Sequence, residues 1–223
     1  MEKRGWTISP NTINIFTECP RCFWLHYRQG IKRPEGPFPT LFSALDRIIK
    51  DYFQQYRERG ILPPLVSGKL PEGRLGKLPS LDLRYEHESG LTIYGRLDEV
   101  FEYPDGSIVP LDHKTRASPP DEVHPAYIVQ ANVYSALLMW KEIKTRPEAF
   151  FVYYVPASPP GGDLFQGIPF HVYVKKVETS LLDVEELIDK ISEVLFSDIV
   201  PPSNPECIFC QYVHKSSHFS STI

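Results

Sequence analysis

The 223-residue sequence lacks the features that mark several classes of protein. No apolar run approaches the roughly 18 residues that a membrane-spanning helix needs, and segment 1–11 lacks the apolar stretch of a secretory signal peptide. There is no internal repeat. The net charge of −4 excludes a uniformly basic protein that coats nucleic acid, although it leaves room for a local basic face. We therefore expect a soluble cytoplasmic protein.

The composition is that of an ordinary globular chain, with 42% apolar and 23% charged residues. A chain of this length can bury a sizeable core without covalent or metal staples. The 22 prolines are about twice the usual share of ~5%, which predicts long loops. We expect one domain over residues 1–223.

Cysteines are few, but their spacing is informative. They form two Cys-x-x-Cys pairs near opposite ends of the chain: Cys19, Cys22, Cys207 and Cys210. A disulfide framework is not expected in a reducing compartment, whereas four thiolates suit zinc or an iron–sulfur cluster. A zinc ribbon separates its pairs by about 15–20 residues. The wide separation therefore predicts that the chain ends meet at a shared metal site, the alternative being four unrelated thiols.

Hydrophobic periodicity and turn signals predict an α/β fold. The helices are expected at about 9–30, 41–59, 126–142 and 180–196, followed by a cysteine tail over about 201–223. The strands are expected at 81–87, 91–103, 108–115, 149–155 and 171–177. Between Cys19 and Pro34 there are four cations and no acid, so this stretch is either a phosphate-contacting patch or a solvated face.

Two acids and a lysine lie on the predicted strands around the Asp105-Gly106 hairpin. Asp112 and Lys114 share one strand face because side chains alternate, and antiparallel pairing can bring Asp98 beside Asp112. Two carboxylates at a sheet edge make an oxygen site for Mg²⁺ or Mn²⁺. A neighbouring lysine can position water and stabilise the charge that grows on an attacked phosphate. The alternative is a surface ion pair on a half-exposed strand.

These motifs resemble those of the PD-(D/E)XK nucleases, most closely the RecB-type and Cas4-like branch. The resemblance covers the chain from Ser9 to Cys210 and rests on the order of its motifs: Gly95…Asp98, Asp112-x-Lys114, Gln130-x-x-x-Tyr134, and cysteines at both ends. It implies a restriction-endonuclease-like mixed sheet flanked by helices. It also implies a hydrolase that cleaves DNA phosphodiester bonds, exonuclease-like, on single strands or ends. The implied partners are DNA and nuclease–helicase or CRISPR-adaptation proteins.

The resemblance also implies roles for single residues. Asp98 and Asp112 would be metal ligands, with the His113 carbonyl completing the set, and Lys114 would be the catalytic lysine. Gln130 and Tyr134 share one helix face and would orient the lysine, the metal water or the DNA strand; the alternative for Tyr134 is core packing. The four cysteines would hold a 4Fe–4S cluster, although two Cys-x-x-Cys pairs suit Zn²⁺ equally well.

The chain departs from the family pattern in two places. The branch often carries a histidine ligand on the helix before the strands, where this chain has Leu45-Asp46-Arg47, so Asp46 is the candidate replacement ligand. The alternative is an ordinary Asp46–Lys50 pair at i,i+4. Cas4-like proteins usually place one cysteine near the N-terminus and three near the C-terminus, whereas here the division is two and two. Two other functions stay open: a catalytically weakened nucleic-acid-binding module and a zinc-stabilised interaction protein.

Overall fold

The structure is a computed structural model that describes residues 5–34, 36 and 40–217. Residues 218–223 of the predicted cysteine tail lie outside the described residues. The chain forms two compact units. The cysteine unit comprises Met1–Phe38, Arg84–Tyr94 and Leu182–Ile223, and the sheet unit comprises Pro39–Leu83 and Gly95–Leu181. The expectation of a single domain stays a prediction.

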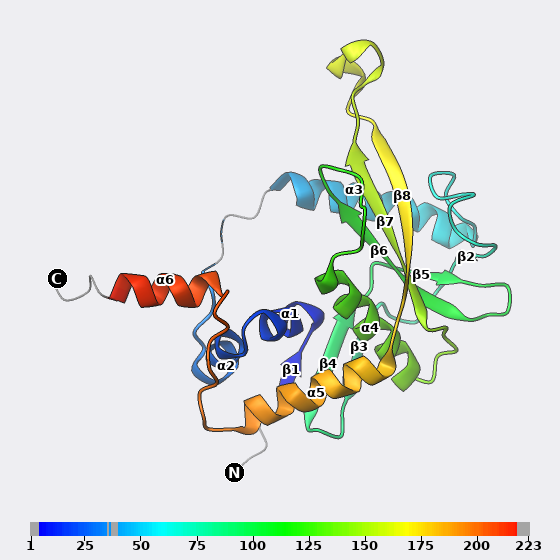
Figure 1. The fold of residues 1–223 in the computed structure, drawn as a ribbon. Helices are drawn as coiled ribbons and strands as arrows, with labels where there is room; N and C mark the ends of the chain where they lie inside the picture. Colours follow the sequence, from blue (N-terminus) through cyan, green and yellow to red (C-terminus); the bar gives the residue numbers. More distant parts are fainter. Residues whose placement is uncertain (1–4, 35, 37–39, 218–223) are drawn as a thin grey trace. The chain divides into compact units, whose positions relative to one another are not determined.

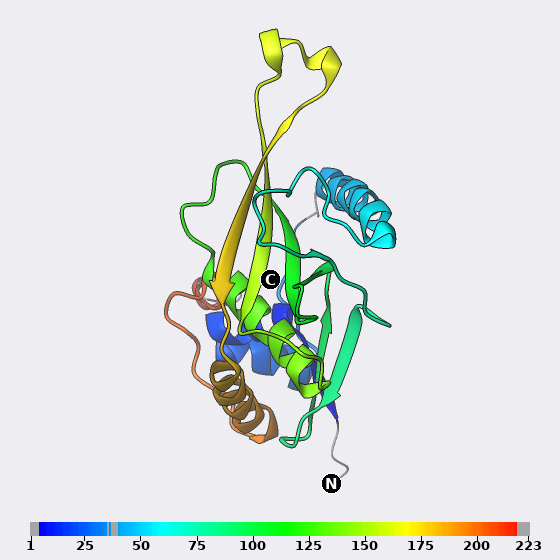
Figure 2. The same cartoon turned by 90° about the vertical axis from the view of Figure 1, so that its right-hand side faces the viewer.

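The sheet unit is built on a mixed five-stranded sheet in the order β2-β5-β6-β7-β8. Its strands are β2 (Arg74–Leu75), β5 (Glu99–Glu102), β6 (Ile108–Thr115), β7 (Glu148–Pro156) and β8 (Phe170–Glu178). Only the β6–β7 pair is parallel among these described strands, because the crossover helix α4 (Pro125–Trp140) connects them. Helices α3 (Thr40–Arg59) and α4 flank the sheet (Figure 2). The predicted α/β class with a mixed, helix-flanked sheet is confirmed.

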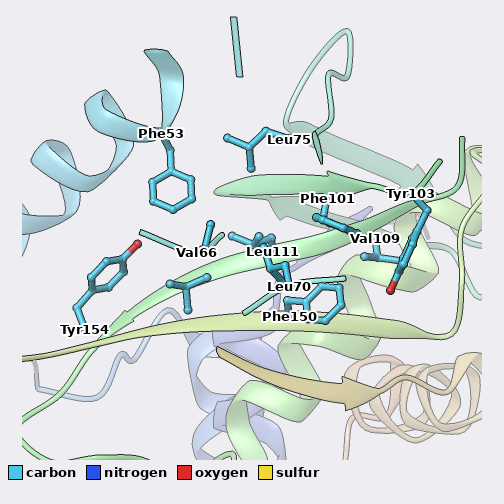
Figure 3. Packing of buried hydrophobic residues seen from close by; sticks show 11 residues of the cluster. Phe53, Val66, Leu70, Leu75, Phe101, Tyr103, Val109, Leu111, Phe150 and Tyr154 are labelled. Atoms are coloured by element: carbon cyan, nitrogen blue, oxygen red, sulfur yellow. The ribbon is translucent and has the colours of Figure 1, made fainter. Parts of the chain in front are cut away.

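Strand β7 is buried on both faces, which explains its uninterrupted apolar sequence. On one face Phe150, Val152 and Tyr154 pack with Phe53 of α3, in the cluster shown in Figure 3. On the other face Phe151 and Tyr153 pack with Ala131 of α4. The alternation of side chains along β6 and β7 therefore assigns one face of the sheet to α3 and the other to α4.

The segment predicted as one strand over 91–103 is two strands, β4 (Leu91–Arg96) and β5. Strand β4 belongs to a separate three-stranded sheet, in the order β1-β4-β3 with β1 (Trp6–Ile8) and β3 (Asp82–Glu86). The chain leaves that sheet at Leu97, whose N–H donates to the Leu81 carbonyl at 2.9 Å. Asp98 consequently lies at the junction between two strands rather than inside one.

The helix predicted at 9–30 is also divided in two: α1 (Pro10–Glu18) and α2 (Pro20–Gln29). Cys19 between them is extended, with φ −162° and ψ 105°, because a proline at position 20 disfavours helical geometry in the residue before it. The other helices of the cysteine unit are α5 (Leu181–Phe196) and α6 (Ile208–Ser217). Arg28 of α2 donates to the Leu195 carbonyl at 2.9 Å, which fixes the end of α5 beside α2.

Strands β7 and β8 continue beyond the sheet as a projecting hairpin, seen in Figure 1. It carries two short 3-10 turns, η1 (Pro160–Gly162) and η2 (Leu164–Gln166), and Phe165 at its tip is fully exposed. Within the described part of the chain, none of the helices combines the length and apolar character that crossing a bilayer requires.

Candidate active site and cysteine site

The antiparallel register of β5 and β6 brings the two predicted acids together. Glu99 pairs with Leu111, so Asp98, the residue just before β5, comes beside Asp112 where the pairing of β5 with β6 ends. Oδ2 of Asp98 accepts a hydrogen bond from the backbone N–H of His113 at 3.2 Å. The Asp98 carboxylate thus accepts the hydrogen bond that a backbone carbonyl would accept if the pairing of β5 with β6 continued. This contact fixes the position of Asp98 relative to Asp112.

Lys114 lies on the same strand face as Asp112, as the alternation predicts. Its Nζ is 2.5 Å from Oδ2 of Asp112 and 2.8 Å from Oε1 of Gln130. The ammonium also lies 4.4 Å from the centre of the Tyr127 ring, within cation–π range. Three kinds of contact therefore hold the lysine head in place beside the carboxylate.

Gln130 and Tyr134 lie one turn apart on α4 and join the two strands of the site. Nε2 of Gln130 donates to Oδ1 of Asp112 at 3.1 Å and to the Tyr134 hydroxyl at 3.0 Å. The Tyr134 hydroxyl in turn donates to the Arg96 carbonyl at 2.8 Å. The helix thus links the acid of β6 to the backbone just before Asp98, and Tyr134 does more than fill the core.

Gly95 allows this helix to approach β4 closely, a role that the sequence motif did not reveal. A Cβ atom on Gly95 would lie 2.8 Å from Cδ1 of Leu137 and 2.8 Å from Cε1 of Tyr134, both in α4. Real Cβ atoms do not show such short contacts, so a larger residue at this position would require the Leu137 and Tyr134 side chains to shift. The reach of the Tyr134 hydroxyl to the Arg96 carbonyl depends on this glycine.

Lys50 of α3 is a second lysine at the site, and sequence reasoning treated it only as a partner of Asp46. Its Nζ lies 2.9 Å from Oδ2 of Asp46 and also 2.9 Å from Oδ1 of Asp98. The Asp46–Lys50 pair at i,i+4 is therefore present, and it reaches the site through Asp98. A basic residue one turn after Asp46 was the available signal, but only the packing of α3 on the sheet reveals the contact with Asp98.

The two strand carboxylates have different electrostatic environments. Burial raises the pKa of Asp112 to about 6, because the neighbouring Lys114 offsets only part of the cost of burying its charge. Burial acts in the same direction on Asp98, but the Lys50 ammonium and the His113 N–H outweigh it and lower the pKa of Asp98 below its ordinary value. Asp98 is thus the stronger acid of the two.

A buried ion pair supports the site from the α3 side, and sequence reasoning missed it. Glu99 is fully buried, and its Oε1 accepts from Arg57 of α3 at 2.7 Å. Burial raises the pKa of Glu99 to about 7 although Arg57 opposes the shift. The His113 ring packs 4.4 Å from Phe53 on the same face, and burial lowers its pKa to about 4, so the ring is neutral at pH 7. These contacts fix α3 to the strands that carry the acids.

The oxygen atoms where β5 begins beside β6 suit a hard divalent cation. Asp98 and Asp112 offer carboxylates, and the His113 carbonyl points to the same side of β6 as its N–H, which faces Asp98. Oxygen donors of this kind bind Mg²⁺ and Mn²⁺. Among the described residues, however, the close group of three or more side chains able to hold a metal is formed by the four cysteines and does not include Asp46, Asp98 and Asp112. The role of Asp46 as a ligand therefore stays a prediction.

The four cysteines meet in the cysteine unit, as predicted, and all are free thiols. Their Sγ atoms lie within 4.8 Å of one another. The Sγ of Cys22 is 3.6 Å from that of Cys207 and 3.6 Å from that of Cys210, and the Cys19–Cys210 distance is 3.8 Å. The break between α1 and α2 contributes one pair, and the start of α6 contributes the other. The donor set fits a metal with four thiolate ligands.

Donors lie beside two of the four sulfurs and favour their negatively charged form, whereas burial raises the pKa values of Cys22 and Cys210. The backbone N–H of Asn204 donates to Cys19 at 3.4 Å, and Nη2 of Arg33 lies 3.9 Å from the sulfur of Cys207. Burial opposes ionisation of Cys207, but the N–H of Cys210 and the neighbouring thiols lower its pKa to about 7. Arg33 also stacks 4.8 Å from the centre of the Phe209 ring. One cation of the basic stretch thus supports the cysteine site.

Comparisons with known proteins give similarity to solved structures only. No protein-family model matches the chain, and no curated protein matches it significantly. Among solved structures, the crystal structure of SSO0001 is 16% identical over 93% of this chain and 84% of its own, with a TM-score of 0.46. An alkaline exonuclease (LHK-Exo) from Laribacter hongkongensis is 11% identical over 96% of this chain and 94% of its own, with a TM-score of 0.43. The structure of LHK-Exo in complex with dAMP is also 11% identical, covers 84% of this chain and 85% of its own, and has a TM-score of 0.42.

Proposed function

We propose that the chain is a divalent-metal-dependent deoxyribonuclease of the PD-(D/E)XK type. The observation that carries the proposal is the closed set of contacts among Asp112, Lys114 and Gln130. A surface ion pair would leave both groups in solvent, whereas Asp112 is 5% exposed and the Lys114 side chain is 17% exposed. Keeping these charges buried is costly unless the site uses them.

The residues of the site can divide the work of phosphodiester hydrolysis. Gln130 holds the Lys114 ammonium at a fixed place, where it can stabilise the negative charge that grows on the attacked phosphate. Tyr134 fixes Gln130 against the Arg96 backbone, so Lys114 and Asp112 are both held through this amide. A divalent cation at Asp98 and Asp112 would supply Lewis-acid stabilisation of the same charge.

The sheet surface beside Lys114 favours a single strand as the substrate. On the sheet face that α4 covers, Lys114 pairs with Tyr153 of β7, and Tyr153 pairs with Tyr173 of the edge strand β8. Lys175 lies two residues along β8 on the same face, and Arg116 follows Lys114 and is exposed. Such cations can pair with phosphates and the half-buried ring of Tyr173 can stack on an unpaired base, whereas the β7 rings on this face are buried under α4.

We also infer that the cysteine site holds a single structural zinc ion. In a tetrahedral site with a Zn–S bond of about 2.3 Å, the sulfurs lie about 3.8 Å apart. Three of the six Sγ–Sγ distances, at 3.6–3.8 Å, match that value, and all four sulfurs lie within 4.8 Å of one another. A 4Fe–4S cluster attaches its four cysteines to four separate iron atoms and needs a wider set. The spacing thus supports zinc over the cluster that the resemblance implies.

The nuclease proposal is tested by release of labelled nucleotides from a single-stranded DNA oligonucleotide in Mn²⁺. We expect the parent to cleave, excess EDTA to stop cleavage, and Lys114→Ala to lower the rate at least 100-fold, in line with the loss of one charge-stabilising group. The matched control is Lys190→Ala, a lysine on the surface of α5. Undiminished cleavage in EDTA contradicts the proposal. DNA binding without turnover in either Mg²⁺ or Mn²⁺ supports the alternative binding module.

A further inference from the structure

The Lys50 ammonium lies between two carboxylates at the edge of the candidate metal site. It is 2.9 Å from Oδ1 of Asp98 and 2.9 Å from Oδ2 of Asp46. The other oxygen of Asp98 accepts the His113 N–H. Both oxygens of Asp98 are thus engaged, one by a neutral donor and one by a full positive charge.

A divalent cation and the Lys50 ammonium compete for the same carboxylate. The hydrogen bond from His113 fixes Asp98 but carries no charge, so it leaves the affinity for a cation largely intact. An ammonium in direct contact with Oδ1 cancels part of the negative charge and repels a second cation a few ångströms away. Metal binding at Asp98 therefore requires that Lys50 withdraw from it.

Asp46 gives Lys50 a place to withdraw to. The two residues are one turn apart on α3 and contact each other directly, so the ammonium can leave Asp98 and keep Asp46 as its partner. The Lys50 side chain is 40% exposed and Asp46 50% exposed, whereas the Asp98 side chain is 18% exposed. The flexible lysine stem has solvent-side room for this movement.

We propose that Lys50 is an internal competitor of the metal, and that Asp46 receives its ammonium when the metal binds Asp98. The proposal rests on the nuclease function, since it assumes a divalent cation at Asp98 and Asp112. In this arrangement Lys50 neutralises part of the negative charge of the carboxylates before the metal binds. It thereby sets the metal concentration at which the site is occupied. Asp46 raises the metal affinity indirectly, by drawing the ammonium away, and is a positioning residue rather than a ligand.

The test measures Mn²⁺ binding to the full chain without DNA, by electron paramagnetic resonance of free Mn²⁺. Lys50→Met should tighten binding about tenfold, because it removes a unit charge in contact with a ligand. Lys50→Arg keeps the charge and should bind Mn²⁺ no more tightly than the parent. Arg47→Met removes a charge from the exposed part of the same helix and should change the affinity by less than about twofold, because exposed charges are screened.

Asp46 is tested in two backgrounds. In the parent, Asp46→Asn should weaken Mn²⁺ binding several-fold, because Lys50 then has Asp98 as its remaining carboxylate partner. In the Lys50→Met background the same change should have no effect. Weakening of similar size in both backgrounds would show that Asp46 is itself a ligand and would overturn its proposed role. Unchanged or weaker binding by Lys50→Met would overturn the competitor role.

These failures are distinguishable from failure of the proposed function. If Mn²⁺ binds the parent and Asp112→Asn weakens that binding, the result supports the metal site independently of the role of Lys50. If the parent binds no Mn²⁺, the nuclease proposal fails and the competitor role fails with it. Circular dichroism of each variant tests whether the fold is retained, and affinities are compared only between folded proteins.

Discussion

Nζ of Lys114 lies 2.5 Å from Oδ2 of Asp112, two residues earlier on the same strand. Adjacent positions on one strand face bring the two side chains near each other, but they do not set the direction of the contact. Gln130 sets it, because its amide donates to the acid and its carbonyl accepts from the lysine. The amide group is oriented by Tyr134, which makes this tyrosine the first target for mutation.

Tyr134→Phe should lower the cleavage rate five- to tenfold at limiting Mn²⁺, in line with the loss of about 1 kcal/mol of hydrogen bonding. The hydroxyl ties Gln130 to the Arg96 carbonyl, so its loss frees the amide that holds Lys114. The measurement is the initial rate against Mn²⁺ concentration, together with the melting temperature. The matched control is Tyr153→Phe, because the Tyr153 hydroxyl is buried and has no hydrogen-bond partner among the described residues. If Tyr134→Phe and Tyr153→Phe have the same effect on the rate and the melting temperature, Tyr134 contributes only packing.

Lys175→Ala should weaken binding of a single-stranded oligonucleotide, and Lys176→Ala should not. The two lysines are neighbours on β8 and lie on opposite faces of the sheet, so only Lys175 shares the face of Lys114. Loss of one phosphate contact should reduce the slope of log affinity against log salt by about 1. Fluorescence anisotropy in EDTA at several salt concentrations measures this slope without cleavage. Equal losses for both variants would indicate general charge attraction in place of a defined path.

Cys19→Ser and Cys207→Ser should each lower the melting temperature and the bound metal together. The four sulfurs join segments from both ends of the chain, so metal binding energy contributes directly to the stability of the cysteine unit. We expect colourless protein with about one zinc per chain by elemental analysis, as one tetrahedral four-thiolate site requires. Parent protein treated with a zinc chelator should melt like the variants.

Two results would contradict this expectation. A brown protein with broad visible absorbance after anaerobic purification would show an iron–sulfur cluster and refute zinc. A variant that melts like the parent and retains its metal would show that the four cysteines do not form one shared site.

Strand β6 and helix α4 were predictable from the sequence because their signals are local. The Asp105-Gly106 turn, the alternation that places Asp112 and Lys114 together, and the i,i+4 spacing of Gln130 and Tyr134 depend on residues close in the chain. The meeting of the cysteine pairs was also predictable, because two Cys-x-x-Cys pairs can complete one four-thiolate set only if the two chain segments come together.

The tertiary structure alone decided that segment 91–103 is divided between two sheets and which distant charges meet. The strand-like sequence over 91–103 cannot show that β4 and β5 belong to different sheets, because both sheets bury apolar side chains. The contact of Lys50 with Asp98, and that of Arg57 with Glu99, depend on how α3 packs across the sheet. Sequence periodicity defines the apolar face of a helix, but the rotation and register of that helix against its neighbours are set by side-chain packing. Asp98, Asp112 and Lys114 were therefore identifiable in the sequence as candidate site residues, whereas the contact of Lys50 with Asp98 was not.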